Sequence, residues 1–176
     1  MRSFFASLLF LLCTTLSAQT IIINGEKTDR SLKWDDFSGT PDHSTDLFAY
    51  TYWYVNYKWG SFPFRGDTAK LQLEVTLELE KRSWRKPNKV SDSLLVHEQG
   101  HFNIGRLFAS SFLQRVNATV LFRSNYQSVI GSIFNEELER YREMEKRYDT
   151  ETNHFHDREQ QRKWDAFLAS ELRKYR

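Results

Sequence analysis

The sequence predicts an α+β fold in which an antiparallel sheet from the first half of the chain packs on helices from the second half. Apolar and polar residues alternate between residues 71 and 80, which is the period-2 pattern of a half-buried strand. After Pro87 the apolar residues recur three and four positions apart, which is typical of amphipathic helices. No repeat and no low-complexity linker interrupts residues 19–176, so we expect a single domain there.

Three strands are expected in the first half. Residues 21–23 read as a short strand that ends in an Asn24-Gly25 turn. Residues 49–59 are strongly aromatic and predict a strand covered on both faces. The strand at residues 71–80 carries a row of carboxylates, which is most simply a solvated face. The alternative is that this strand is an open sheet edge that binds an extended peptide.

Three helices are expected in the second half. Ser91 is a candidate N-cap for a long helix at residues 94–121, and further amphipathic helices are predicted at residues 126–147 and 157–175. Gly100 and Gly105 lie inside the first helix, where each costs about 1 kcal/mol relative to alanine. Their presence fits a helix whose backbone another segment approaches closely.

Residues 1–18 have the pattern of a secretory signal peptide. Arg2 precedes a largely apolar run at residues 4–13, and small polar residues follow up to Ala18. The run has about 10 residues against the roughly 20 that span a bilayer, so we expect no permanent membrane anchor. We therefore expect an exported protein, periplasmic or extracellular. Cleavage after Ala18 removes Cys13, the only cysteine.

The charge pattern excludes a typical nucleic-acid-binding surface. Twenty-five basic and 23 acidic residues give a formal charge of +2, and the two signs are interspersed along the chain. A nucleic-acid footprint needs clustered basic residues, so we expect no nucleic-acid partner.

The pentapeptide from His97 to His101 has the form H-E-x-x-H. Two histidines four apart on a helix lie on one face and are close enough to bind one ion. Glu98 follows the first histidine and is expected to act as general base on a water that zinc activates. Without cysteine, the remaining ligand must be histidine or a carboxylate, which suits catalytic Zn²⁺ better than structural zinc.

The third ligand is sought in the polar stretch at residues 147–157, which we expect to be a loop between the last two helices. It holds His154, His156 and Asp149. A glutamate of the preceding helix, Glu136 or Glu137, is the other alternative, because catalytic zinc sites take three protein ligands and leave one position open. The residues alone leave these four possibilities open.

Three separated blocks resemble the secreted bacterial domain-of-unknown-function family 922. They are the segment at residues 34–39, the block at residues 95–104 around the pentapeptide, and residues 148–154 followed by Gln160 and Trp164. This family is grouped with the H-E-x-x-H metallopeptidases as zinc-dependent proteases. The resemblance covers nearly the whole chain after the signal peptide.

The resemblance implies a zincin-like fold and a zinc metalloendopeptidase that acts on a peptide or protein. It places the third ligand at His154, beside His97 and His101, with His156 as the alternative. The family usually has glycine where this chain has Phe155, so the local backbone is expected to differ.

Two neighbouring residues complete the expected site. Asp149 is expected to accept a hydrogen bond from the second nitrogen of a zinc histidine. Tyr148 is expected to donate a hydrogen bond to the developing oxyanion; the alternative is that it is an aromatic residue that packs at the end of a helix. The alternative function is a non-catalytic zinc-binding protein of the cell envelope, in which the metal serves folding or partner binding; such a protein does not need Glu98.

Overall fold

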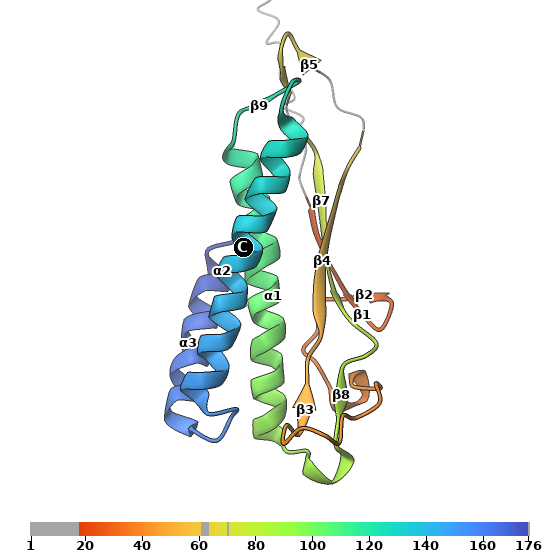
Figure 1. Ribbon diagram of the computed structural model, residues 1–176, viewed down its shortest axis with the longest axis vertical. Coiled ribbons are helices and arrows are strands. Elements are labelled where there is room, and N and C mark those ends of the chain that lie inside the picture. Colours follow the sequence, from red (N-terminus) through yellow and green to blue (C-terminus); the bar gives the residue numbers. More distant parts are fainter. Residues whose placement is uncertain (1–17, 61–63, 70, 176) are drawn as a thin grey trace, which may run out of the picture.

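A four-stranded sheet and three helices make up most of the computed structural model, which describes residues 18–60, 64–69 and 71–175. The helices lie on one face of the sheet, with α1 next to the sheet (Figure 1). This arrangement confirms the α+β class. Residues 1–17, most of the predicted signal peptide, lie outside the described residues. Among the described helices, none is long and apolar enough to cross a membrane.

The main sheet is mixed and not wholly antiparallel. Its order is β2-β1-β7-β4, from strands β1 (Ala18–Ile23), β2 (Glu26–Lys27), β4 (Trp53–Trp59) and β7 (Leu73–Leu79). β1 runs parallel to β7, because a long connection carries the chain away before β7 forms, whereas the β1–β2 and β4–β7 pairs are antiparallel. The prediction of an antiparallel sheet is therefore wrong for this pairing.

Strand β7 lies in the middle of the sheet. It is hydrogen-bonded to β1 on one side and to β4 on the other, so the prediction of an open peptide-binding edge there is wrong. Its alternation is confirmed: Leu73, Val75 and Leu77 are fully buried, while Glu74 faces solvent and pairs with Lys58. Four apolar side chains on one face favour a central position, since that face is then completely covered.

The aromatic stretch at residues 49–59 forms two strands instead of one. β3 (Ala49–Tyr50) pairs with β8 (Trp84–Arg85), and β4 begins at Trp53. The break occurs at Tyr52, whose backbone N–H donates to the Ser83 hydroxyl at 3.0 Å. Three short strands pair at the far end of the molecule, and two 3₁₀ turns complete the elements: β5 (Phe64–Arg65), β6 (Thr68–Ala69), β9 (Leu121–Phe122), η1 (Trp34–Asp36) and η2 (Pro87–Lys89).

The three helices are α1 (Asp92–Ala118), α2 (Tyr126–Thr152) and α3 (Arg158–Arg173). The Ser91 N-cap is confirmed, since its hydroxyl accepts from the Leu94 N–H at 3.2 Å. Helix α1 ends at Ala118, before the predicted residue 121, because Leu121 pairs in β9.

Helix α2 continues five residues beyond the predicted end at residue 147 and reaches Thr152. Tyr148 and Thr152 are fully buried, so the buried face of the helix continues beyond its last aliphatic residues. This extension places Asp149 on a helix and not in a loop. The first turns of α1, strand β3 and the turn between α2 and α3 therefore meet at one end of the molecule (Figure 1).

Candidate metal centre

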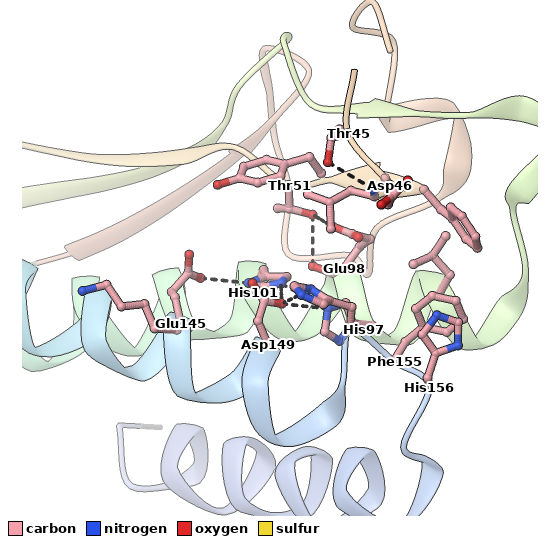
Figure 2. A pocket seen from close by; sticks show the side chains of 17 residues that line it. Thr45, Asp46, Thr51, His97, Glu98, His101, Glu145, Asp149, Phe155 and His156 are labelled. Atoms are coloured by element: carbon pink, nitrogen blue, oxygen red, sulfur yellow. Dashed lines mark hydrogen bonds and ion pairs between the residues drawn. The ribbon is translucent and has the colours of Figure 1, made fainter. Parts of the chain in front are cut away.

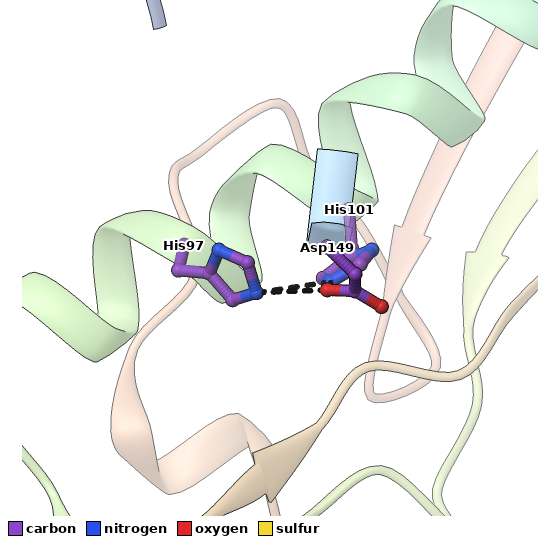
Figure 3. Close-up of side chains that lie close together, drawn as sticks. All are labelled: His97, His101 and Asp149. Atoms are coloured by element: carbon purple, nitrogen blue, oxygen red, sulfur yellow. Dashed lines mark hydrogen bonds and ion pairs between the residues drawn. The ribbon is translucent and has the colours of Figure 1, made fainter. Parts of the chain in front are cut away.

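Three side chains from two helices converge on one point. His97 and His101 come from α1 and Asp149 comes from α2 (Figure 3). The His97 Nε2 atom lies 3.1 Å and the His101 Nε2 atom 3.0 Å from Asp149 Oδ1. The two Nε2 atoms are 3.3 Å apart. These separations suit one small ion, since two atoms bound at 2.0–2.1 Å to a tetrahedral centre lie about 3.3 Å apart.

Both histidines have a hydrogen-bond acceptor behind the ring. His97 Nδ1 faces Gln161 Oε1 at 3.1 Å, and His101 Nδ1 faces Glu145 Oε1 at 3.3 Å. An acceptor at Nδ1 fixes the N–H there and leaves the Nε2 lone pair free. The two imidazole nitrogens and one carboxylate oxygen could together hold a metal ion, and both catalytic zinc sites and non-haem iron sites use such a donor set.

The orientation of Gln161 is itself fixed by its neighbours. Its amide nitrogen donates to the Tyr148 hydroxyl at 2.7 Å and to Asp165 Oδ1 at 2.9 Å, so its oxygen must face His97. The Tyr148 hydroxyl in turn donates to the backbone carbonyl of His97 at 3.0 Å. A chain of directional hydrogen bonds therefore holds His97 in one tautomer. The acceptor at His97 Nδ1, the Gln161 side-chain oxygen, comes from α3.

The electrostatics of the cluster favour a positive charge between the rings. Burial alone would lower the pKa of His101, but Glu145 and Asp149 outweigh it and hold that pKa well above the ordinary value. Burial alone would raise the pKa of Asp149, but hydrogen bonds from His101 and His97 hold it well below the usual range. A bound cation would take the place of the proton that the raised pKa of His101 keeps on its ring.

Glu98 lies beside the cluster and is almost completely buried. Burial raises its pKa, although His101 and His97 act in the opposite direction. Its Oε2 atom accepts a hydrogen bond from the Thr51 hydroxyl at 2.6 Å. Thr51 directly follows strand β3 and faces α1 from the sheet side. Its hydroxyl therefore fixes the orientation of the Glu98 carboxylate.

A cavity of about 400 Å³ opens onto these side chains. Figure 2 shows His97, His101 and Glu98 at its centre, with Thr51 facing them from the other side. Phe155 and His156 lie at one end and Glu145 at the other. The cavity is large enough to receive several side chains of a ligand.

Residues 21–157 match the model of a family described as a bacterial protein of unknown function (DUF922). The chain belongs to this family. The match confirms the resemblance stated above and includes both helices that carry the cluster, but it ends before α3. Neither the curated proteins nor the solved structures contain a significant match.

In this DUF922 protein the two other predicted histidines lie near the cavity, and His154 reaches the border of the cluster. His154 Nδ1 is 3.4 Å from Asp149 Oδ1, and half of the His154 side chain is exposed. His156 is exposed and lies edge-on to Phe48, with ring centroids 6.3 Å apart. Both line the cavity.

The remaining predicted residues lie further from the opening. Tyr148 is fully buried, and its ring stacks on that of His97 with the centroids 4.7 Å apart. Its hydroxyl lies against the α1 backbone, on the side of His97 away from the cavity. Glu136 and Glu137 pair with Arg115 at 2.7 and 2.8 Å and do not join the cluster.

The two glycines of α1 have the expected function. A Cβ atom at residue 100 would lie 2.5 Å from Tyr148 Cζ, and one at residue 105 would lie 2.8 Å from Trp53 Cδ2. Helix α2 and strand β4 thus approach α1 where it has no side chain. At residue 100 this contact also brings Asp149 to the histidines, because Tyr148 is its neighbour in the chain.

Sequence reasoning missed Thr51, Glu145 and Gln161. Glu145 precedes Asp149 by four residues and so shares its helix face, which is a signal that could have been used. Thr51 and Gln161 carry no spacing signature, because each reaches the cluster only through the tertiary fold.

Proposed function

We propose that this protein is a zinc-dependent metallopeptidase with a zincin-like fold, and that the cavity at the head of α1 is its active site. The observation that carries the proposal is the convergence of three ligand atoms beside a buried carboxylate at an open cavity. Two Nε2 atoms and one carboxylate oxygen lie 3.0–3.3 Å apart, and each histidine has an acceptor at its other nitrogen.

His97, His101 and Asp149 would hold the zinc ion. The sequence favoured His154 as third ligand, but the distances favour Asp149, because its Oδ1 atom is near both Nε2 atoms whereas His154 is half exposed. When bound, zinc would supply Lewis acidity, which lowers the pKa of water to about 7 and polarises a carbonyl group.

Glu98 would act as general base. Its carboxylate borders the cavity, and burial keeps its pKa above the ordinary value, which brings the group nearer to the pH at which it must exchange protons. It would take a proton from a water molecule in the cavity and return it to the leaving amine. The hydrogen bond from Thr51 keeps the carboxylate oriented for both transfers.

Strand β3 supports a peptide substrate. Phe48 and Tyr50 direct their backbone groups towards β8, where the carbonyl of Phe48 accepts from Lys86 at 2.7 Å. Backbone direction alternates along a strand, so the groups of Ala49 and Thr51 point to the opposite edge. Both residues line the cavity, and an extended peptide could pair along that edge.

Metal content and peptide cleavage, measured on the same samples, test the function. We expect one zinc per wild-type chain and cleavage of members of a broad peptide library. Glu98→Gln should retain the zinc and lose cleavage by at least about 100-fold, because it removes the base but no ligand. Glu143→Gln, an exposed carboxylate on α2, is the matched control and should behave as wild type.

Zinc at full occupancy without cleavage of any library member would contradict the enzyme and favour the non-catalytic zinc-binding alternative. Export remains part of the proposal and rests on the pattern of residues 1–18. Finding a chain that begins at Gln19 in the periplasm or the medium would support it.

A further inference from the structure

The cavity has two chemically different ends. Phe155 lies at one end and Glu145 at the other, with the two histidines between them (Figure 2). Leu94, one turn before His97 on α1, belongs to the same end as Phe155. A ligand that spans the cavity therefore meets the Phe155 ring, with His156 beside it, on one side of the two histidines and the Glu145 carboxylate on the other.

The apolar end is a small hydrophobic cluster separate from the main core. Its buried members are Ala49, Leu94 and Phe155. Phe48 and Trp34 pack against them, and Trp34 also packs against the main core. The rings of Phe48 and Phe155 have centroids 6.1 Å apart, and the ring of His97 lies 6.4 Å from that of Phe155. Ala49, Leu94, Phe155 and Phe48 also line the cavity, so this part of the cluster forms a wall of that cavity.

Phe155 reaches this wall through an uncommon backbone conformation. Asn153, His154 and Phe155 have φ angles of 46°, 48° and 75°, so three consecutive residues without glycine are left-handed. This conformation is uncommon for any residue with a side chain and a genuine outlier for a bulky one. The turn is closed by hydrogen bonds from His154 N to Asp149 O at 3.0 Å and from Asp157 N to Thr152 O at 2.9 Å.

Strained backbone persists only where the surroundings over-determine it, and it occurs preferentially at functional sites. The strain at Phe155 directs the ring into the cavity wall and contributes nothing to the main core. A residue that only closed the α2–α3 turn would not need an aromatic ring; glycine would close it without strain.

We propose that Phe155, with Leu94 and Phe48, forms a subsite for an apolar side chain next to the scissile bond, and that Phe155 sets the size this subsite accepts. The inference rests on the proposed function and specifies its substrates: peptides with a medium-sized apolar residue on one side of the cleaved bond. Burying a leucine side chain in such a wall corresponds to a preference of about tenfold or more over glycine.

Binding of dipeptide hydroxamates to the zinc-loaded protein tests this subsite. The probes differ only in the side chain next to the hydroxamate: glycine, leucine or naphthylalanine. The wild type should bind the leucine probe at least tenfold more tightly than the glycine probe. In Phe155→Ala and Phe155→Gly this preference should fall at least threefold, while the naphthylalanine probe gains relative to leucine.

Phe167→Ala is the matched control, because Phe167 is 40 % exposed on α3 and does not line the cavity. It should leave all three affinities within twofold of wild type. Phe155→Leu keeps an apolar side chain and serves if the smaller variants do not fold; it too should shift the preference towards naphthylalanine. Unchanged ratios in every Phe155 variant would overturn the subsite and leave the proposed function intact. A wild type that binds zinc but no hydroxamate, or no zinc at all, would overturn both.

The left-handed backbone conformation at Phe155 can be tested by stability measurements that require neither zinc nor activity. Glycine tolerates positive φ and alanine does not, so Phe155→Gly should unfold at a higher urea concentration than Phe155→Ala. The opposite order would overturn the argument from strain.

Discussion

Both halves of helix α1 bury apolar side chains, but only the N-terminal half also buries ionisable ones. In the C-terminal half, Phe108 and Phe112 are fully buried and lie 5.2 Å from the ring of Phe134 on α2. In the N-terminal half the buried side chains include His97 and Glu98, each held by hydrogen bonds from other elements. Burial of apolar area stabilises the fold, whereas a buried polar group needs its partner to avoid a penalty. The aromatic half therefore supplies the rigidity that the polar half needs for its site.

The largest effect is expected when a side chain is truncated in the aromatic half. Phe108→Ala removes a fully buried ring and should lower the free energy of unfolding by about 3–5 kcal/mol, measured by urea denaturation. Zinc affinity of the folded protein should stay within about threefold of wild type, because the ring does not touch the ligands. Loss of zinc affinity without loss of stability would contradict the division of α1 into two halves.

The next effect belongs to the polar half and decides the third ligand. Asp149→Ala should weaken zinc binding by more than about 100-fold, measured by competition with a chelating dye, since loss of a ligand exceeds the 10–100-fold effect of its supporting residues. His154→Ala should change the affinity less than about tenfold, because that side chain is half exposed at the border of the cluster. The reverse order would restore His154 as ligand.

The sequence predicted the features that depend on local spacing. The two histidines four residues apart, the Ser91 N-cap and the alternation along β7 each follow from the period of a single element. The close approach at Gly100 was also predictable, because a glycine inside a helix needs a reason.

The features that the sequence did not predict depend on contacts between elements that are distant in the chain. The parallel pairing of β1 with β7 joins segments more than 50 residues apart, and no local pattern records it. The preference for His154 over Asp149 came from the family resemblance. The predicted end of α2 was also too early and left Asp149 in a loop, since the last turns of that helix are polar apart from Tyr148. The left-handed backbone at Phe155 occurs where the family usually has glycine, so the departure was visible but its purpose was not.

A smaller effect is expected behind His97. Gln161→Leu removes the acceptor at Nδ1 and should weaken zinc binding by about 10–100-fold, because the imidazole is no longer held in one tautomer. Gln161→Glu keeps an acceptor at Nδ1 but places a second carboxylate oxygen against Asp165, so it should recover only part of the affinity. Gln160→Leu, the preceding residue on α3, is the matched control. The visible spectrum of the Co²⁺-substituted protein should change in Gln161→Leu and not in the control; equal affinities in both variants would exclude a positioning role.

The smallest effect is expected at two buried tyrosines of α2. Tyr141 packs against Phe108 in the aromatic half of α1, and Tyr148 packs against His97 in its polar half. Burial raises the pKa of Tyr141 to about 12 and raises the pKa of Tyr148 as well. A phenol whose pKa is raised on folding contributes full stability below its unfolded pKa of about 10, and that stability falls as the pH rises through the folded pKa, because only the unfolded chain releases the proton. Wild-type stability should therefore decline between about pH 10 and pH 12, by roughly 2 kcal/mol or less per tyrosine.

Tyr141→Phe should flatten part of this decline and leave zinc affinity unchanged, since its ring lies in the aromatic core. Tyr148→Phe should flatten the decline too, but it should also weaken zinc binding at neutral pH, because its hydroxyl accepts the hydrogen bond that orients Gln161. Urea midpoints at pH 8, 10 and 11, together with zinc titrations at pH 7.5, separate the two residues. If both variants lost zinc affinity equally, the aromatic and polar halves would not be independent, and the site would depend on the packing of the whole helix pair instead of on the hydrogen bonds around His97.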